Sequence, residues 1–336
     1  MKAFERIQPA SWEEAAAALA AAKKDGVSAE PKGAGTDLVD RLKERNVAPD
    51  RVVDLRRLPG NDTIERSPSQ VSIGALVTLT QVAEKLRAEL PALADACEGA
   101  ATPQIRNAAT LAGNLCQRPR CWYFRSADFE CLKKGGSECF AQKGENVFHA
   151  VFGNHTCAIV HPSAAGVALS AYGARVETLS AKGRRTIPIA DFFVTPEASL
   201  ASENSLADGE LVTRIVVPRH AAQRAAYRKI KHKQTFDWPL ADAAVAYRDD
   251  GGVARDVRIV LGSAAPVPWR LKKVEALVEG QRIDAALAAR AAASATEGAT
   301  PLAKNGYKLQ LVTAVVRRAL LAAAGLPDGT EKAPQA

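Results

Sequence analysis

The sequence predicts an α+β protein made of more than one domain. Its 336 residues can build two or three hydrophobic cores, and 47% of them are hydrophobic, so most of the chain should be folded. Strand and helix patterns alternate over the first fifty-odd residues, whereas the last third opens with a hairpin pattern and continues with helical patterns. The two ends of the chain should therefore form different α/β units.

The N-terminal part predicts the order β-α-β-α-β. A strand is expected at residues 2–7, and Ser11 with Glu14 should form a capping box for a helix to about Lys24. The glycine loop KGAGTD then precedes an amphipathic helix, and RVVDL, residues 51–55, is the next strand. Free N–H groups and the helix dipole make such a loop a possible phosphate site. An ordinary strand–turn–helix corner, in which Asp37 only caps the helix, fits the motif equally well.

The middle and C-terminal parts contain further clear patterns. Two strands should flank a Ser-Pro-Ser turn, Thr80 should cap a helix that stops before Pro91, and a second helix should include residues 92–97. A strand end (CAIVHP), a helix and strand (163–180), a strand and helical turn (184–193) and a strand to Pro218 follow. Residues 219–224 are the best linker. Beyond them we expect a hairpin at DDGG, three helices from about Leu271, Asp284 and Tyr307, and a polar tail from Pro327.

The segment 101–157 carries the most chemistry. It opens with ATPQIRNAATLAGNL, whose small residues indicate a backbone loop that a flat cofactor can approach. Five of the six cysteines follow: Cys116, Cys121, Cys131, Cys139 and Cys157. Four thiolates suit a [4Fe–4S] cluster, zinc or two disulfides, and scattered buried thiols are the remaining alternative. After Cys121 the gaps are nine, seven and seventeen residues, which favour an irregular loop around one cluster over the close cysteine pairs typical of zinc.

The formal charge of +8 is modest, and Lys and Arg are interspersed with Asp and Glu. Nucleic-acid binding is therefore a weak hypothesis, and docking on acidic protein partners is a better one. The sequence contains no run of eighteen apolar residues, so no membrane span is predicted. The N-terminus has no apolar signal-peptide region.

Several motifs together resemble the FAD-binding medium subunit of the xanthine dehydrogenase and molybdenum hydroxylase family. In chain order they are KGAGTDL, RVVDLRRLPG, SIGALVTL, PQIRNAATLAGNL, YRKIKHK with FDWPLA, and GSAAPVPWR. The resemblance spans nearly the whole chain. The cysteine segment resembles a sub-branch with an extra [4Fe–4S] cluster, which includes aromatic aldehyde oxidoreductases and 4-hydroxybenzoyl-CoA reductase. It implies Cys121, Cys131, Cys139 and Cys157 as ligands and Cys116 as a bystander.

The resemblance also implies the fold and the cofactor site. A PCMH-type FAD-binding domain should span residues 1–222, with lobes at about 1–60 and 61–222 and the cysteine insert at about 116–157. A C-terminal domain like that of the CO dehydrogenase flavoprotein should span 223–330. The residues implied to contact FAD come from both lobes and from the C-terminal domain: Lys32, Gly33, Ala34, Gly35, Thr36, Asp37, Leu38, Ala101, Thr102, Thr110, Gly113, Asn114, Leu211, Lys229 and Trp238.

Two positions depart from the family pattern. Ala34-Gly35 replaces Gly-Gly, which requires a negative φ at Ala34, and Ser163-Ala164 replaces a Ser-Asp whose carboxylate holds cofactor hydroxyls. Without the family, the residues alone favour simpler roles: Lys229 on a solvated strand face, Trp238 and Trp269 as packing anchors, and His149, His155 and His161 as partly exposed loop residues.

The resemblance implies an electron-transfer subunit without a substrate site of its own. Molybdenum cofactor on a large partner would oxidise the substrate, and [2Fe–2S] clusters on a small partner would feed FAD here, in a heterotrimer or a dimer of it. FAD would pass the electrons to a small-molecule or protein acceptor. A stand-alone flavin oxidase and a non-catalytic metal-binding assembly protein are the alternatives. The sequence leaves localisation open between the cytoplasm and the periplasm, where relatives are exported on a partner's twin-arginine signal.

Overall fold

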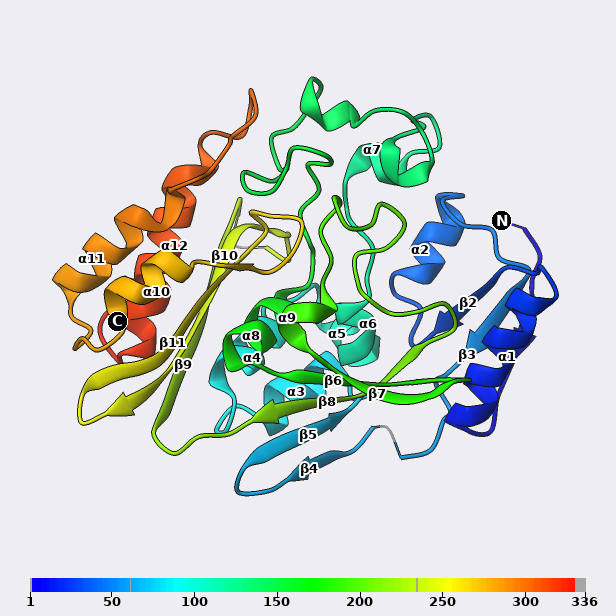
Figure 1. Ribbon diagram of the computed structural model, residues 1–336, viewed down its shortest axis with the longest axis horizontal. Coiled ribbons are helices and arrows are strands. Elements are labelled where there is room, and N and C mark those ends of the chain that lie inside the picture. The colour runs from blue at the N-terminus through cyan, green and yellow to red at the C-terminus, as the bar shows by residue number, and fades with distance from the viewer. Residues whose placement is uncertain (1, 61, 234, 330–336) are drawn as a thin grey trace.

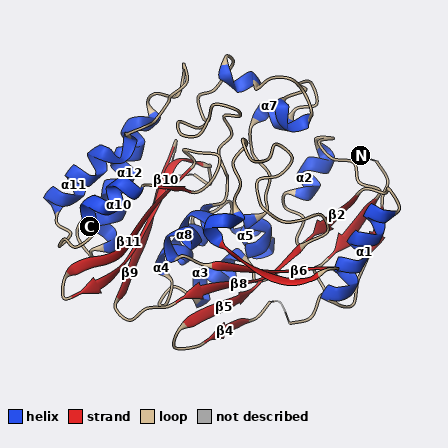
Figure 2. Cartoon of the chain, viewed as in Figure 1, coloured by secondary structure: helices blue, strands red, loops and turns tan. Residues whose placement is uncertain are grey.

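The structure, a computed structural model, describes residues 2–60, 62–233 and 235–329. They form three β-sheets with helices packed between and around them (Figure 1). Figure 2 shows helices and strands mixed along the whole chain, and the predicted α+β class is confirmed. No helix among the described residues is both long and apolar enough to cross a membrane.

The first sheet contains three parallel strands in the order β1-β3-β2, as the β-α-β-α-β pattern predicts. Its elements are β1 (Glu5–Ile7), α1 (Trp12–Lys24), β2 (Ala29–Lys32), α2 (Leu38–Lys43) and β3 (Arg51–Asp54). Neighbouring residues of β3 face opposite sides of the sheet, so Val53 joins the main core with α1, while Val52 packs against Leu38 and Leu42 of α2. The glycine loop joins the end of β2 to the start of α2.

The second sheet has five antiparallel strands in the order β4-β5-β8-β6-β7. The strands are β4 (Ile64–Arg66), β5 (Gln70–Gly74), β6 (Arg175–Ser180), β7 (Gly183–Pro188) and β8 (Leu211–Pro218). The helices of this part are α3 (Leu79–Lys85), α4 (Pro91–Glu98), α5 (Pro103–Ala108), α6 (Leu111–Leu115), α8 (Ala164–Tyr172) and α9 (Ile189–Phe192). Most of them lie between the second and third sheets (Figure 1).

The third sheet has the order β12-β11-β10-β9, and its central strand β10 contributes buried residues from both faces. Its elements are β9 (Gln223–Lys231), β10 (Pro239–Asp250), β11 (Val253–Gly262), β12 (Trp269–Arg270), α10 (Lys272–Val278), α11 (Ala285–Ala293) and α12 (Lys308–Ala323). Ala244 and Ala246 of β10 belong to the main core, whereas Val245 and Tyr247 pack with the C-terminal helices. The hairpin and the three C-terminal helices therefore form as predicted.

The cysteine segment is mostly irregular. Between residues 117 and 157 it contains only α7 (Trp122–Arg125) and two single 3₁₀ turns, η1 (Leu132–Lys134) and η2 (Phe140–Gln142). A third 3₁₀ turn, η3 (Ser294–Thr296), lies elsewhere in the chain and follows α11. Tyr123, Ala141 and Ala158 form its small core, with Phe129 and Phe140 packed against them. Because this core is small, the segment depends on contacts with the rest of the chain.

Some local predictions were wrong. The cap of α3 is Thr78, because its hydroxyl accepts from Gln81 N–H and the Gln81 side chain accepts from Thr78 N–H, whereas Thr80 donates to Asn107. The Glu14 side chain accepts from Ala10 N–H, so Ser11 caps α1 without a reciprocal box. CAIVHP is an extended loop without strand pairing, since its main chain bonds to the neighbouring loops at Ala150 and Ala265.

Three further predictions concern the small-residue loop, the linker and the polar tail. ATPQIRNAATLAGNL contains the short helices α5 and α6 instead of an open loop. Strand β8 ends at Pro218 and β9 begins at Gln223, so only four residues separate them. Most of the predicted polar tail, residues 330–336, lies outside the described residues.

Candidate functional site

The glycine loop and helix α6 approach each other closely at Thr110. Thr110 caps α6 by accepting a 3.1 Å hydrogen bond from Gly113 N–H. A Cβ added to Gly113 would lie 2.8 Å from the Thr110 hydroxyl, and one added to Gly33 would lie 3.2 Å from it. A larger residue at Gly33 would therefore push the loop away from Thr110, and one at Gly113 would disturb the Thr110 cap of α6.

The conformation of the glycine loop explains its composition. Gly35 has φ +88°, in the left-handed region that favours glycine, whereas Ala34 keeps a negative φ, as its side chain requires. Lys32 forms a 3.2 Å ion pair with the buried carboxylate of Asp54 at the ends of β2 and β3. This pair fixes the start of the loop.

Two cavities lie on either side of this loop. The larger, of about 430 Å³, is lined by Ala34 and Thr110 together with Arg56 and Arg57. The other has a volume of about 380 Å³, and we call it the flavin cavity after the cofactor that the resemblance implies. Most of the residues implied by the resemblance line it: Thr36, Asp37, Ala101, Thr102, Gly113, Asn114, Lys229 and Trp238. Residues from the first sheet, from α5 and α6 and from the third sheet thus meet at one cavity.

Other implied residues do not line either cavity. Leu38 packs on Val52, and Leu211 is buried in the main core on β8. Lys32, Gly33 and Gly35 lie behind the cavity walls, where they set the shape of the loop. These residues can act on a ligand only through the backbone that they position.

The position of the family's missing carboxylate lies in the wall of the flavin cavity. Ala164 lines the cavity at the start of α8. The preceding Ser163 caps α8 and donates a 2.8 Å hydrogen bond to Asn114 Oδ1. The serine therefore orients Asn114, while Ala164 gives this wall a methyl group instead of a charge.

Lys229 is half-buried, so the simpler interpretation of a solvated strand face was wrong. Its ammonium group donates to the carbonyl oxygen of Gly99. Burial, reinforced by the neighbouring charge of Lys231, lowers the pKa of Lys229 to about 8. Lys229 therefore brings a titratable cation to the cavity.

Trp238 is 52% exposed and is not a packing anchor. The Arg120 guanidinium carbon lies 5.1 Å from the centre of its ring, within cation–π range. Trp269, by contrast, stacks on Phe152 with ring centres 5.7 Å apart and is an anchor as expected.

Asp37 connects the glycine loop to the cysteine segment. It accepts hydrogen bonds from Arg125 Nη2 at 2.7 Å and from Arg118 N–H at 3.1 Å, and it pairs with Arg120 at 2.9 Å. Burial would raise the pKa of Asp37, but Arg120 and Arg125 outweigh this effect and hold it below its usual value. Asp37 thus makes no side-chain cap on α2.

Sequence reasoning did not single out these arginines. Arg118, Arg120 and Arg125 fall in the stretch CQRPRCWYFR, where the cysteines dominated the interpretation. The density of arginines between and beside Cys116 and Cys121 was the available signal, but their partner carboxylate lies more than eighty positions earlier in the chain.

The four implied cluster ligands meet at a second, nearby site. Cys121, Cys131, Cys139 and Cys157 all line one small cavity, together with Tyr123, Phe140 and Ile159, and we call it the cysteine cavity. All six cysteines are free thiols, so the disulfide alternative does not hold in this structure. Cys116 ends α6 outside the cysteine cavity, and burial raises its pKa to about 12.

The surroundings of the thiols favour a thiolate at Cys139 and direct amide N–H groups at both Cys139 and Cys121. The Cys157 thiol donates to Cys139, which, with the N–H groups of Ala158, Ala141 and Gln142, lowers the pKa of Cys139 to about 6. Burial raises the pKa of Cys121 to about 11, although the N–H groups of Phe124 and Tyr123 oppose this shift. Amide N–H groups directed at cysteine sulfurs are a feature that tunes iron–sulfur clusters.

The space between the four thiols is only about 10 Å³. Within the described ranges, no group of three or more His, Cys, Asp or Glu side chains is arranged around a single metal ion. A cubane holds each thiolate on a different iron, so its ligands stand further apart than those of one ion. The donor set suits such a cluster, but the cysteine side chains would have to separate to admit it.

Two of the three nearby histidines are buried, contrary to the expectation of exposed loop residues. His149 Nε2 lies 3.2 Å from Cys121 Sγ, and burial lowers the pKa of His149 to about 4. His161 Nδ1 accepts from Ser163 N–H, away from the thiols. His155 is exposed. His149 is therefore a neutral imidazole beside one sulfur.

Together these features are typical of the class of proteins that bind an extended cofactor beside a glycine loop and capped helix starts. The comparisons with known proteins agree with that class. Residues 2–220 match the family of FAD-binding domains in molybdopterin dehydrogenase, and residues 225–323 match the CO dehydrogenase flavoprotein C-terminal domain.

The relatives cover nearly the whole chain. The FAD-binding subunit PaoB of aldehyde oxidoreductase from Escherichia coli is 35% identical over 321 residues, 93% of this chain and 95% of that protein. The carbon monoxide dehydrogenase medium chain of Hydrogenophaga pseudoflava is 29% identical over 95% of this chain and 96% of its own. The chain belongs to the FAD-binding medium subunits of the molybdenum hydroxylase family, which are subunits of oxidoreductases.

Solved structures agree in fold. A chain of carbon monoxide dehydrogenase from Hydrogenophaga pseudoflava superposes with a TM-score of 0.73 at 27% identity, covering 96% of this chain and 97% of that one. A chain of quinoline 2-oxidoreductase from Pseudomonas putida 86 gives 0.74 at 25% identity, covering 97% and 99%. The expected family fold is confirmed.

Proposed function

We propose that this chain is the FAD- and [4Fe–4S]-carrying electron-transfer subunit of a molybdenum-containing aldehyde oxidoreductase. The relative named as an aldehyde oxidoreductase subunit supports the substrate class, since it matches over nearly the full length of both chains. Partners would be a large molybdenum-cofactor subunit and a small [2Fe–2S] subunit. We propose the same domain division as above, at residues 1–222 and 223–330.

The flavin cavity is the observation that carries the FAD part of this proposal. Thr36 and Asp37 line it from the glycine loop, Gly113 and Asn114 from α6, and Lys229 from β9. Backbone N–H groups of the loop and of the capped helix start would bind the pyrophosphate, and Asn114, held by Ser163, would donate or accept at the flavin. Bound FAD supplies a carrier that takes up electrons and passes them on.

Lys229 would act on the charge of the bound cofactor. Its ammonium is held in place by the Gly99 carbonyl and shielded from water by burial. A cation at this position would favour negative charge on a neighbouring ring system. Lys229 would therefore raise the affinity of the site for electrons.

Cys121, Cys131, Cys139 and Cys157 would hold the [4Fe–4S] cluster. Their approach to one cavity, their amide N–H donors and the apolar walls around them support this assignment. Arg120 and Arg125 pair with Asp37 of the glycine loop, which joins the supports of the two cofactor sites. The cluster would lie on a route to an acceptor or stabilise the segment.

The test is the cofactor content of the purified chain. It should release FAD on denaturation and contain about four iron and four acid-labile sulfide per chain, as a cubane requires. Changing any of the four implied ligands to Ala should remove the iron, whereas the matched variants Cys97→Ala and Cys116→Ala should retain it. Stoichiometric zinc without sulfide would exclude the cluster, and protein without flavin would exclude the FAD assignment.

A further inference from the structure

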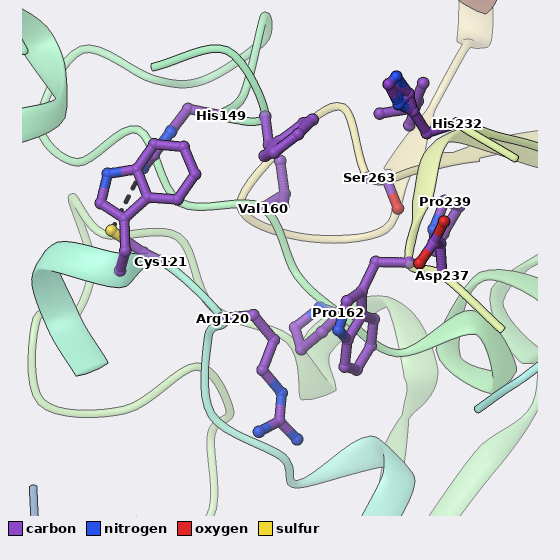
Figure 3. A pocket seen from close by; sticks show the side chains of 13 residues that line it. Arg120, Cys121, His149, Val160, Pro162, His232, Asp237, Pro239 and Ser263 are labelled. Carbon is purple, nitrogen blue, oxygen red and sulfur yellow. Dashed lines mark hydrogen bonds between the residues drawn. The ribbon is translucent and has the colours of Figure 1, made fainter. Parts of the chain in front are cut away.

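A fourth cavity, of about 310 Å³ and shown in Figure 3, shares lining residues with both the flavin cavity and the cysteine cavity. Arg120 and Trp238 line both this cavity and the flavin cavity. Cys121 and His149 line both this cavity and the cysteine cavity. None of the residues implied to bind FAD lines it except Trp238. We call it the middle cavity.

The walls of the middle cavity suit a flat aromatic molecule. Three aromatic side chains contribute to them: Trp122, Phe148 and Trp238. Trp122 and Phe148 meet edge to face with ring centres 5.8 Å apart, and Phe148 is 48% exposed, so its ring has a free side. Val160 and Leu240 add aliphatic surface. An aromatic ligand that stacks on these side chains, or meets them edge to face, would bind most tightly.

Two polar atoms of the lining residues are buried without a partner. They are Nε of Arg120 and Nδ1 of His149, for which the described part of the chain offers no hydrogen bond. The other nitrogen of His149 already faces the Cys121 sulfur, and Figure 3 shows that contact. An unpartnered guanidinium N–H needs an acceptor, and the free imidazole nitrogen can accept or donate according to its tautomer.

The charges of the middle cavity disfavour a phosphate-bearing dinucleotide. Its one arginine, Arg120, is already paired with Asp37 and Asp40. Asp237 adds a carboxylate to the lining. A ligand here should therefore be uncharged, aromatic and equipped with oxygen atoms that can switch between accepting and donating.

We infer that the middle cavity binds a quinone-class electron acceptor. A quinone carbonyl would accept from Arg120, and the hydroxyl of the corresponding hydroquinone would donate to His149. Conversion of quinone to hydroquinone takes up two electrons and two protons. Reduced, anionic FAD on the other side of Trp238 would supply both electrons and one proton, and solvent would supply the second proton. This inference rests on the proposed function, because it requires a flavin in the neighbouring cavity.

The test is equilibrium binding of duroquinone to the oxidised, FAD-containing full chain, followed by quenching of tryptophan fluorescence. All ring carbons of duroquinone are substituted, so it does not add cysteine thiols. Binding should be saturable. Phe148→Ala should weaken it about tenfold, as expected for an aromatic contact. Val160→Phe should abolish it by filling the cavity, and Leu277→Ala, at another exposed apolar residue, should leave it unchanged.

A second measurement separates the possible failures. The chemically reduced variants are mixed with duroquinone or with ferricyanide, which needs no apolar site, and flavin reoxidation is followed. We expect Val160→Phe to lose only the duroquinone reaction. If duroquinone reoxidised the flavin of Val160→Phe as fast as that of the wild type, the inference would be overturned. Loss of FAD from Val160→Phe would also overturn it, because the cavity would then belong to the flavin. Wild-type protein without any FAD would instead contradict the proposed function. A requirement for a protein acceptor, with no saturable quinone binding, would also overturn the inference.

Discussion

Asp37, at the start of α2, accepts a 2.7 Å hydrogen bond from Arg125 of α7, although the two residues are 88 positions apart. With the 2.9 Å contact to Arg120, this bond joins the glycine loop to the cysteine segment. Both arginines are mostly buried, so the carboxylate neutralises charge that water does not reach. The geometry of the two candidate cofactor sites is thus linked through one side chain.

Asp37→Asn should destabilise the protein by about 2 kcal/mol, because it removes the nearest counter-charge of two mostly buried guanidinium groups and leaves them only the longer ion pairs with Asp40 and Glu44. The matched variant Asp208→Asn removes an exposed ion pair with Lys23 and should cost less than about 0.5 kcal/mol. Urea unfolding measures both. The folded-state pKa of Asp37 lies below 3.8, so its contribution is present above that pH and lost as pH falls through the folded value. The difference between wild type and variant should narrow in strong acid. A constant difference would contradict the ion-pair account.

Gly35→Asp should release FAD while the protein stays folded. The new side chain would press on Lys32 and Val39 and distort the proposed pyrophosphate loop, and the left-handed backbone would add about 1 kcal/mol of strain. Gly298→Asp carries the same strain at φ +78° in an open loop and serves as the control. FAD released per chain is measured after denaturation. Full flavin content in the Gly35 variant would remove the loop from the cofactor site.

Lys229→Met should lower the midpoint potential of the bound flavin by roughly 30 mV, which for two electrons corresponds to about 1.4 kcal/mol. The reason is the loss of a half-buried cation from the flavin cavity. In the wild type the potential should fall more steeply as pH rises through about 8, where Lys229 loses its proton. Lys273→Met, at an exposed lysine that does not line the cavity, is the control. Redox titration with mediators gives the flavin potential of the wild type and of each variant. Identical potentials in the wild type and Lys229→Met would exclude the proposed role of Lys229.

Lys308 should make the stability rise with pH, as Asp37 does in acid, but over the range from neutral to alkaline pH. Its buried ammonium donates to the carbonyls of Phe148, His149 and Ser263, which ties the cysteine segment to the third sheet. Burial, opposed by Asp242, lowers the pKa of Lys308 to about 7. Between that value and 10.5 the unfolded chain binds more protons, so wild-type stability should gain up to about 1.4 kcal/mol per pH unit from this group.

Lys308→Met should lack that gain. The exposed Lys273→Met should keep the wild-type slope. Unfolding free energies measured at several pH values from 7 to 10 compare the three proteins. Equal slopes in all of them would show that Lys308 does not titrate in this range.

The fold was predictable where local patterns are strong. The DDGG turn, Asp284 and the helix after Tyr307 were placed correctly, because turn chemistry, caps and apolar periodicity act over a few residues. The helices α5 and α6 were missed because five or six residues are too few for a periodic signal, and packing stabilises them.

The site was only partly predictable for a related reason. Family motifs pointed to Gly113, Asn114 and Lys229, which do line one cavity. The contacts of Asp37 with Arg120 and Arg125, and of His149 with Cys121, depend on how distant segments meet. No local pattern encodes such contacts.

The most direct test of the account is whether the isolated chain acts on a substrate. Purified chain with its cofactors is mixed with an aromatic aldehyde, and flavin absorbance is followed by stopped flow, with chemical reductant as the positive control. We expect that the reductant bleaches the flavin, that the aldehyde alone does not, and that the aldehyde does so once the molybdenum-bearing and [2Fe–2S] partners are added. Flavin reduction by the aldehyde in the isolated chain would contradict it and indicate a stand-alone flavin oxidase.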